Sequence, residues 1–217
     1  MKTVDLTHVI TPGMPVYPGT EPPSFETGCT LEKDGFVEKK ITMFSHTGTH
    51  MDAPAHLIAD GKTLDEYPAE DLMGKAVVLD VSAGRGGEIE DSWLEPIKAF
   101  PGETRFVLLR TGWSRYWGTR DYFEGYPTLS MKAARRLAES DIRGVGVDAI
   151  SFDPEGSRDL PVHRVFLSRG KILIENLTQL EKLPKGIFFL TCLPLKFKGA
   201  DGAPVRAVAT LSPAGPT

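Results

Sequence analysis

The sequence places three potential metal ligands, His46, His50 and Asp52, at intervals of four and two residues. On a helix, the two histidines would share a face, but the aspartate would not follow them. On a strand, side chains separated by an even number of residues point to the same side. Residues 37–44, just before them, favour a strand, and Pro54 ends the strand because it has no N–H to donate. We therefore predict that the three residues lie together at the end of a strand that runs into a loop.

Histidine is scarce in this chain, and its distribution supports the same interpretation. Four of the five histidines are His46, His50, His56 and His163. Imidazole and carboxylate groups together form a ligand set that suits zinc, manganese or iron. Three ligands on one side of a strand, with a position left for water, are typical of a catalytic metal site. The alternative for His56 is a packed loop residue, and for His163 a residue that follows Pro161 in a turn.

Length and composition indicate one globular domain over residues 1–217, long enough to bury a substantial core. The formal net charge of −4, without a basic stripe, argues against nucleic-acid binding. No stretch is long and apolar enough to cross a membrane. Cys29 and Cys192 are interpreted as free thiols in a reducing compartment. We therefore expect a cytoplasmic protein whose partner is a small-molecule substrate.

Short apolar runs separated by turns predict a mixed α/β fold with a mixed sheet and more strand than helix. The clearest helix is predicted over residues 130–139, with Ser130 or Thr128 as its cap. A shorter helix over residues 92–99 requires Pro96 in its first turn. Strands are predicted over residues 3–8, 75–81, 105–110, 144–149, 172–175, 187–192 and 205–211.

Several other residues admit both a structural and a functional role. Asp148 and Asp153 could approach a site, but a role in a turn is the favoured interpretation. The aromatic-rich segment 113–123 could form a pocket wall, a lid or an oligomer interface. Thr49 could orient a ligand through a hydrogen bond. Thr47, by contrast, is expected to face away.

Residues 46–56 carry a longer pattern, His-Thr-Gly-Thr-His-Met-Asp-Ala-Pro-Ala-His. This stretch resembles the His-x-Gly-Thr-His-x-Asp-x-Pro-x-His signature of the metal-dependent cyclase family, which includes bacterial kynurenine formamidases and isatin hydrolases. Further segments that resemble the family lie at residues 5–8, 15–19, 109–113, 146–151 and 163–177. The signature is specific for the family but not for one substrate.

The resemblance implies a swivelling β/β/α-type domain that assembles as a homodimer or homotetramer. It implies that His46, His50 and Asp52 hold one metal ion and that His163 holds a second. Asp52 and Glu175 would bridge the two ions. Two Zn²⁺ ions per chain are the expected cofactors, and Mn²⁺ is the alternative.

His56 and Tyr17 complete the site that the resemblance implies. His56 would be the catalytic proton shuttle, and Tyr17 would line the substrate pocket where the formamidases typically have Trp. The implied function is hydrolysis of a small amide by metal-activated water, as in arylformamidases, which convert N-formylkynurenine to kynurenine and formate. Tyr17 in place of Trp leaves open an isatin-hydrolase-like enzyme, or a lactone or cyclic-amide hydrolase, with a single Mn²⁺. A third interpretation is a metal-stabilised binding protein without turnover. The complete set of metal ligands and the presence of His56 argue against it.

Overall fold

An eight-stranded sheet closes on itself in the computed structural model, which describes residues 2–83, 87–100, 102 and 104–211. The strand order is β1-β12-β11-β5-β7-β9-β10-β4, and an additional pairing of β12 with β4 closes the ring. These strands are β1 (Lys2–Asp5), β4 (His50–Asp52), β5 (Met73–Asp80), β7 (Phe106–Arg110), β9 (Gly144–Val147), β10 (Ile172–Glu175), β11 (Phe188–Pro194) and β12 (Gly202–Leu211). Strand β12 makes closure possible because its first residues pair with β4 and its later residues pair with β11.

The sheet is mixed, as predicted, and both of its faces are buried along β7, β9 and β10. Strands β5, β7, β9 and β10 run parallel to one another, whereas β1, β4, β11 and β12 pair antiparallel. Alternate residues of β7 point to opposite faces. Phe106 and Leu108 pack inside the ring, and Val107 and Leu109 pack on the outer face against the helices. The prediction of a mixed α/β fold with more strand than helix is confirmed.

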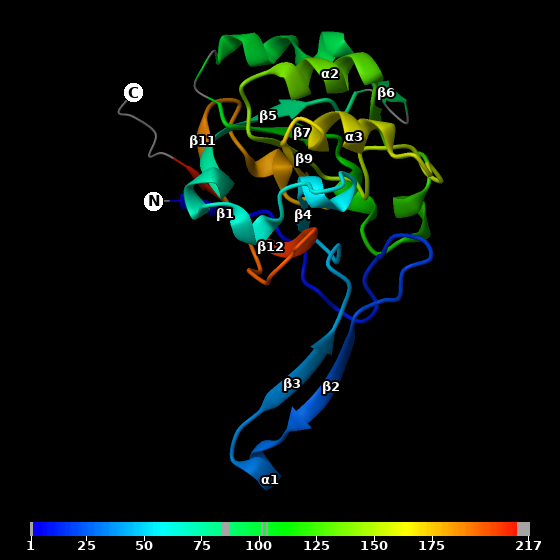
Figure 1. Cartoon of the computed structure of the whole chain (residues 1–217), viewed down its shortest axis with the longest axis vertical. Helices are drawn as coiled ribbons and strands as arrows, with labels where there is room; N and C mark the ends of the chain where they lie inside the picture. Colours follow the sequence, from blue (N-terminus) through cyan, green and yellow to red (C-terminus); the bar gives the residue numbers. More distant parts are fainter. Residues whose placement is uncertain (1, 84–86, 101, 103, 212–217) are drawn as a thin grey trace.

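The helices cover the outer face of the parallel strands (Figure 1). Helix α2 (Met131–Glu139) matches the predicted helix, and the Ser130 hydroxyl caps it by accepting a hydrogen bond from the Ala133 N–H at 3.3 Å. Strands β7 and β9, on either side of α2 in sequence, are parallel neighbours, so the three elements form a βαβ unit. Helix α3 (Pro161–Leu167) was not predicted, because the group that caps it comes from outside the segment.

The predicted helix over residues 92–99 needs a correction. The structure has a 3₁₀ helix, η4 (Asp91–Ala99), and Pro96 lies inside it rather than in a first α-helical turn. Proline has no N–H and cannot make the i to i−4 hydrogen bond of an α-helix in that interior position. The segment therefore forms successive tighter turns instead.

The remaining elements are short. They are the strands β6 (Glu88–Ile89) and β8 (Thr128–Leu129), and the 3₁₀ helices η1 (Pro54–His56), η2 (Leu64–Glu66), η3 (Ala69–Leu72), η5 (Trp113–Tyr116), η6 (Arg120–Phe123) and η7 (Leu180–Lys182). Among the described residues, no helix has the length and apolar character needed to cross a membrane.

A hairpin extends away from the body of the molecule, and we call residues 24–42 the arm (Figure 1). It consists of β2 (Ser24–Cys29), the short helix α1 (Leu31–Asp34) and β3 (Glu38–Thr42). The predicted strand over residues 37–44 corresponds to β3, every residue of which is exposed. The strand therefore belongs to the arm and ends before the histidine signature begins.

Candidate metal centre

His46, His50 and Asp52 do not share one strand, and the prediction is corrected on this point. His50 and Asp52 lie on β4, whereas His46 lies in the turn between the arm and β4. Gly48, between them, has a φ of 67°, a left-handed conformation that glycine adopts without steric cost. The turn folds His46 back, so that its Nδ1 lies 2.7 Å from Oδ1 of Asp52. His50 Nε2 lies 3.3 Å from the same oxygen.

Strand pairing brings Glu175 to the same place. Glu175 ends β10 and lies directly opposite His50 in the antiparallel pairing of β10 with β4. Its two carboxylate oxygens diverge: Oε2 lies 3.4 Å from His50 Nε2, and Oε1 lies 3.1 Å from His163 Nε2. The Glu175 carboxylate thus spans the gap between two histidines that come from distant parts of the sequence.

His163 reaches the centre from the first turn of α3, where Asp153 holds it. The Asp153 carboxylate accepts hydrogen bonds from the backbone N–H groups of Val162 and His163, and its Oδ2 lies 2.6 Å from His163 Nδ1. A proton on Nδ1 leaves Nε2 facing Glu175 and Asp52. The favoured interpretation of Asp153 as a turn residue therefore missed this contact. Asp148, in contrast, is a structural residue: its buried carboxylate binds the Thr111 and Gly112 N–H groups.

Asp52 is the shared member of two groups of potential metal ligands. One group is His46, His50 and Asp52, and the other is Asp52, His163 and Glu175; within each, the ligand atoms lie within 4.8 Å of one another. Buried carboxylates and imidazoles at these distances form the donor set that suits zinc or manganese. The residues present therefore fit a divalent metal ion.

The charges of this cluster depend strongly on one another in the metal-free protein. Burial alone would lower the pKa of His46, but the carboxylates of Asp52 and Asp201 raise that pKa to about 10. Burial would raise the pKa of Asp52, yet His46 and His50 hold it well below its usual range. Burial would also lower the pKa of His163, but the carboxylates of Asp153, Asp52 and Glu175 raise that pKa well above its ordinary value. A metal ion would take the place of the protons that these imidazoles carry.

His56 and Asp201 lie beside this cluster on the more exposed side. His46 Nε2 lies 3.0 Å, and His56 Nδ1 3.6 Å, from Oδ2 of Asp201. Sequence analysis did not single out Asp201, which has no spacing relation to the signature and meets it only because β12 pairs with β4. The next residue, Gly202, leaves room for the His46 ring, because a Cβ there would lie 2.4 Å from His46 Cε1.

All seven predicted site residues line one cavity of about 430 Å³. They are Tyr17, His46, His50, Asp52, His56, His163 and Glu175. The Tyr17 side chain is 39% exposed at this cavity, so it is accessible to a small molecule. Thr47, as expected, takes no part: its hydroxyl donates to the carbonyl oxygen of Phe44 at 2.8 Å.

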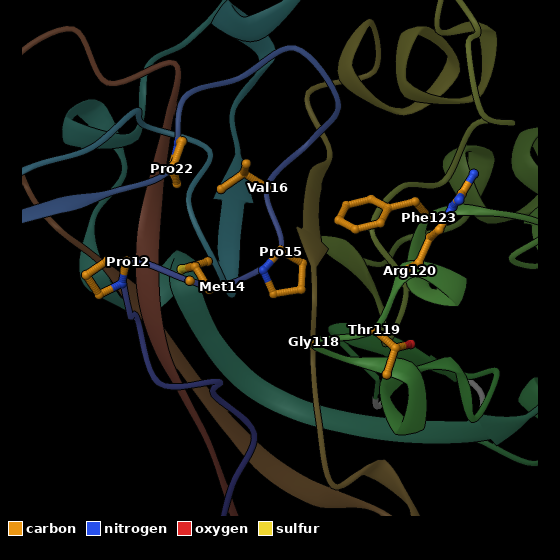
Figure 2. Close-up of a pocket in the computed structure, with 10 residues that line it drawn as sticks. Pro12, Met14, Pro15, Val16, Pro22, Gly118, Thr119, Arg120 and Phe123 are labelled. Atoms are coloured by element: carbon orange, nitrogen blue, oxygen red, sulfur yellow. The ribbon is translucent and has the colours of Figure 1, made fainter.

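We call residues 6–23, between β1 and β2, the N-terminal loop. A neighbouring cavity of about 420 Å³ separates this loop from the aromatic-rich segment (Figure 2). Pro12, Met14 and Pro15 face Arg120 and Phe123 across it. Its lining contains none of the potential metal ligands, whereas Pro15 and Val16 line both cavities. The N-terminal loop is therefore the wall between a histidine-rich cavity and a largely apolar one.

His8, which follows β1 in the sequence, stacks on Trp117 of the aromatic-rich segment, with ring centroids 3.9 Å apart and planes 5° from parallel. Burial lowers the pKa of His8 from 6.5 to about 4, and its Nε2 has no hydrogen-bond partner among the described residues. Folding therefore favours the neutral imidazole at this position.

This burial predicts a pH dependence of stability. Between pH 6.5 and 4, the unfolded chain binds a proton at His8 that the folded protein does not, so the free energy of unfolding decreases as pH falls. A His8→Phe variant keeps a stacked ring and removes this titration. On going from pH 7 to pH 5, the melting temperature of the unaltered protein should fall by about 2–4 °C more than that of the variant. Equal decreases in two thermal scans would contradict the prediction.

The comparisons with known proteins agree with this geometry. The Cyclase family model, described as "Putative cyclase", matches residues 4–154. A kynurenine formamidase from Bacillus cereus is 34% identical over 213 residues, which cover 96% of this chain and 98% of the relative. The structure of isatin hydrolase A from Labrenzia aggregata, bound to benzyl benzoate, superposes with a TM-score of 0.87 at 30% identity, covering 97% of this chain and 94% of that one.

A third relative is described as a predicted metal-dependent hydrolase from Bacillus stearothermophilus. It is 32% identical to this chain, with a TM-score of 0.76, and the match covers 96% of this chain and 97% of that one. The matches extend over nearly the whole chain and therefore include the segments that supply the cluster. The signature of residues 46–56, the family model and the full-length similarity together show that this protein belongs to the cyclase family of metal-dependent hydrolases.

Proposed function

We propose that this protein is a metal-dependent hydrolase that cleaves a small aryl amide, as a kynurenine formamidase does, with a role in tryptophan catabolism. The observation that carries the proposal is the convergence of seven residues from four parts of the chain on one cavity. Two of its potential ligand groups share the buried carboxylate of Asp52. The 34% identity to a kynurenine formamidase over nearly the whole chain supports the choice of substrate.

In this proposal, His46, His50 and Asp52 hold one metal ion, and His163 holds a second, with Asp52 and Glu175 between the two. The divergent carboxylate oxygens of Glu175 support a bridging role. Zn²⁺ is the proposed ion, with two per chain. A bound divalent cation lowers the pKa of its water and supplies hydroxide near pH 7.

His56 is the proposed proton shuttle because it is close to the cluster and neutral near pH 7. Its ring centroid lies 4.1 Å from that of His46 and 6.3 Å from that of His163. Burial lowers the pKa of His56, and the positive charges of His46 and His163 lower it further. A neutral imidazole can accept a proton from the attacking water and return it to the leaving nitrogen. The contact of Nδ1 with Asp201 would orient the ring for both steps.

An isatin-hydrolase-like activity with a single Mn²⁺ is the second candidate. Two observations favour it: the TM-score of 0.87 to isatin hydrolase A and the presence of Tyr17 at the cavity. This alternative keeps the same cavity and changes the substrate to a cyclic amide.

Metal content and a substrate panel distinguish the two candidates. Protein purified without chelator or metal-affinity tag is analysed for metal per chain, and then assayed with N-formylkynurenine, a neutral aryl formamide and isatin. We expect two zinc ions per chain, and we expect the two formyl amides to be hydrolysed faster than isatin. One manganese ion with preferential opening of isatin would favour the second candidate. No metal after reloading, and no hydrolysis, would overturn both.

We propose further that the chain forms a homodimer or homotetramer through the arm. An isolated two-stranded hairpin is at best marginally stable in water, so the arm needs a surface to pack on. Its side chains Leu31, Phe36, Val37 and Ile41 are each more than half exposed. Exposed apolar clusters of this kind mark interaction sites, and a second copy of the chain is the proposed partner.

Shortening the arm should reduce the mass of the particle. Phe25 pairs with Ile41, so residues 26–40 can be replaced by an Asn-Gly turn that keeps this pair. Light scattering on a sizing column is expected to give a multiple of the chain mass for the unaltered protein and a smaller multiple for the shortened one. A Lys40→Gln variant, altered on the charged face of the arm, is the control and should keep the larger mass. A shortened protein with unchanged mass would contradict the proposal.

A further inference from the structure

We infer that Tyr122, a buried residue of the aromatic-rich segment, is a positioning residue for the metal centre: it holds His50 through the side chain of Asn176 and the carbonyl group of Gly48. The inference rests on the proposed metal centre but concerns metal binding rather than the choice of substrate. It gives the aromatic-rich segment a role beyond that of a pocket wall or an interface.

Three consecutive hydrogen bonds carry the connection. The Tyr122 hydroxyl donates to Oδ1 of Asn176 at 2.7 Å. The amide Nδ2 of Asn176 donates to the Gly48 carbonyl oxygen at 2.9 Å. The same oxygen lies 2.8 Å from Nδ1 of His50, which must therefore carry its proton there. The other ring nitrogen of His50, Nε2, is the one that faces the carboxylates of Asp52 and Glu175 and can serve as a metal ligand.

The position of Asn176 is determined by its backbone. It follows Glu175 directly, in the left-handed conformation with a φ of 57°, which asparagine adopts more readily than most residues. Its N–H donates to the carbonyl oxygen of Ala149, and its carbonyl oxygen accepts from the Thr49 hydroxyl at 2.6 Å. The residue therefore ties the end of β10 to the turn that precedes His50. What remains adjustable is the rotation of its side-chain amide.

Tyr122 stabilises the observed orientation of that amide. The Gly48 carbonyl oxygen can only accept, so the NH₂ group faces it, and the Tyr122 hydroxyl then donates to the amide oxygen on the other side. The Tyr122 side chain is fully buried, and its ring packs edge-on against Trp117 with centroids 5.1 Å apart. Without the hydroxyl, either amide orientation would leave a polar atom of Asn176 without a partner. The bond to Gly48, and with it the constraint on His50, would then weaken.

A Tyr122→Phe variant tests this because it removes one hydroxyl and keeps the ring. We expect its affinity for Zn²⁺, measured on chelator-treated protein by competition with a chromophoric chelator, to fall about 10-fold, at the lower end of what loss of an outer hydrogen-bond partner causes. The visible spectrum of the Co²⁺-loaded variant should also change, since it reports the geometry of the ligands. Tyr116→Phe is the matched control: among the described residues, its hydroxyl accepts a hydrogen bond from the exposed Arg115 and from no group of the metal centre, so both readouts should stay unchanged.

Asn176→Gly supplies the second variant, because glycine tolerates the left-handed backbone and lacks the amide. It should lower Zn²⁺ affinity at least as much as Tyr122→Phe does. In the Asn176→Gly background, the further change Tyr122→Phe should have no additional effect on affinity, since both residues act through one chain of bonds. Melting temperatures of the metal-free variants identify any general loss of folding.

The outcomes separate this inference from the proposed function. Failure of the unaltered protein to bind Zn²⁺ or Co²⁺ would refute the metal centre and the inference together. Tight binding by the unaltered protein and equally tight binding by Tyr122→Phe, with an unchanged Co²⁺ spectrum, would refute the inference alone. Additive losses in the double variant would mean that Tyr122 does not act through Asn176, which also overturns it.

Discussion

Asp52→Asn is expected to abolish metal binding and hydrolysis together. Asp52 is buried, and its carboxylate lies within 3.5 Å of nitrogen atoms of His46, His50 and His163. It is the residue common to both ligand groups at the centre. An asparagine keeps the shape but loses the negative charge, so neither group retains its shared anionic ligand. We expect no bound metal and a decrease in kcat/KM of at least about 10³-fold, because the activated water is lost.

Elemental analysis and a hydrolysis assay on the same preparation check this prediction. Asp121→Asn, on the exposed surface of the aromatic-rich segment, serves as a matched substitution and should behave like the unaltered protein. The argument would fail if Asp52→Asn retained both its metal and a substantial rate. Retention of metal with loss of rate would assign Asp52 to catalysis rather than to binding the ion.

His56→Ala has the second largest expected effect, and it should act on the rate without removing the metal. His56 lies outside the two ligand groups that share Asp52, although it reaches the cavity and the edge of the cluster. Loss of a general acid–base group typically reduces a rate by about 10²–10⁴-fold. The decrease should appear in kcat, with KM little changed, because the imidazole acts on protons that move during the reaction.

Metal content again separates the possible roles of His56. A variant that keeps the full metal content and loses kcat supports the proton shuttle. A variant that loses metal would instead identify His56 as a ligand, in the third group with His46 and Asp201. His56→Gln, which has a similar size but no titratable nitrogen, should be as slow as His56→Ala.

Most of the sheet could be predicted from the sequence, because the burial of its strands is a local pattern. The predicted 172–175 strand matches β10, and the run at 105–110 contains β7. Helix α2 combined an apolar spacing with its own capping serine, so its signal lay within the segment. Helix α3 lacked such a signal, because the Asp153 carboxylate that binds its first N–H groups lies several residues away.

The metal centre likewise combines residues that a local pattern predicts with residues that only distant contacts bring together. His46, His50 and Asp52 were found by spacing, but the reason for their convergence was different from the predicted one. They meet through a left-handed turn at Gly48 rather than through a continuous strand. Neither Asp201 nor Asn176 was predicted as a site residue, since their approach to the histidines depends on which strands pair with β4.

By itself, the sequence determined the ligand types, their family signature and the strands that carry a buried core, since side-chain chemistry and burial periodicity are properties of short segments. Only the tertiary structure decided which carboxylates meet which imidazoles. Closure of the sheet brings β4 between β10 and β12, so that Glu175 and Asp201 reach the signature from either side. Such contacts join residues more than a hundred positions apart, and their geometry is set by strand pairing that no local pattern encodes.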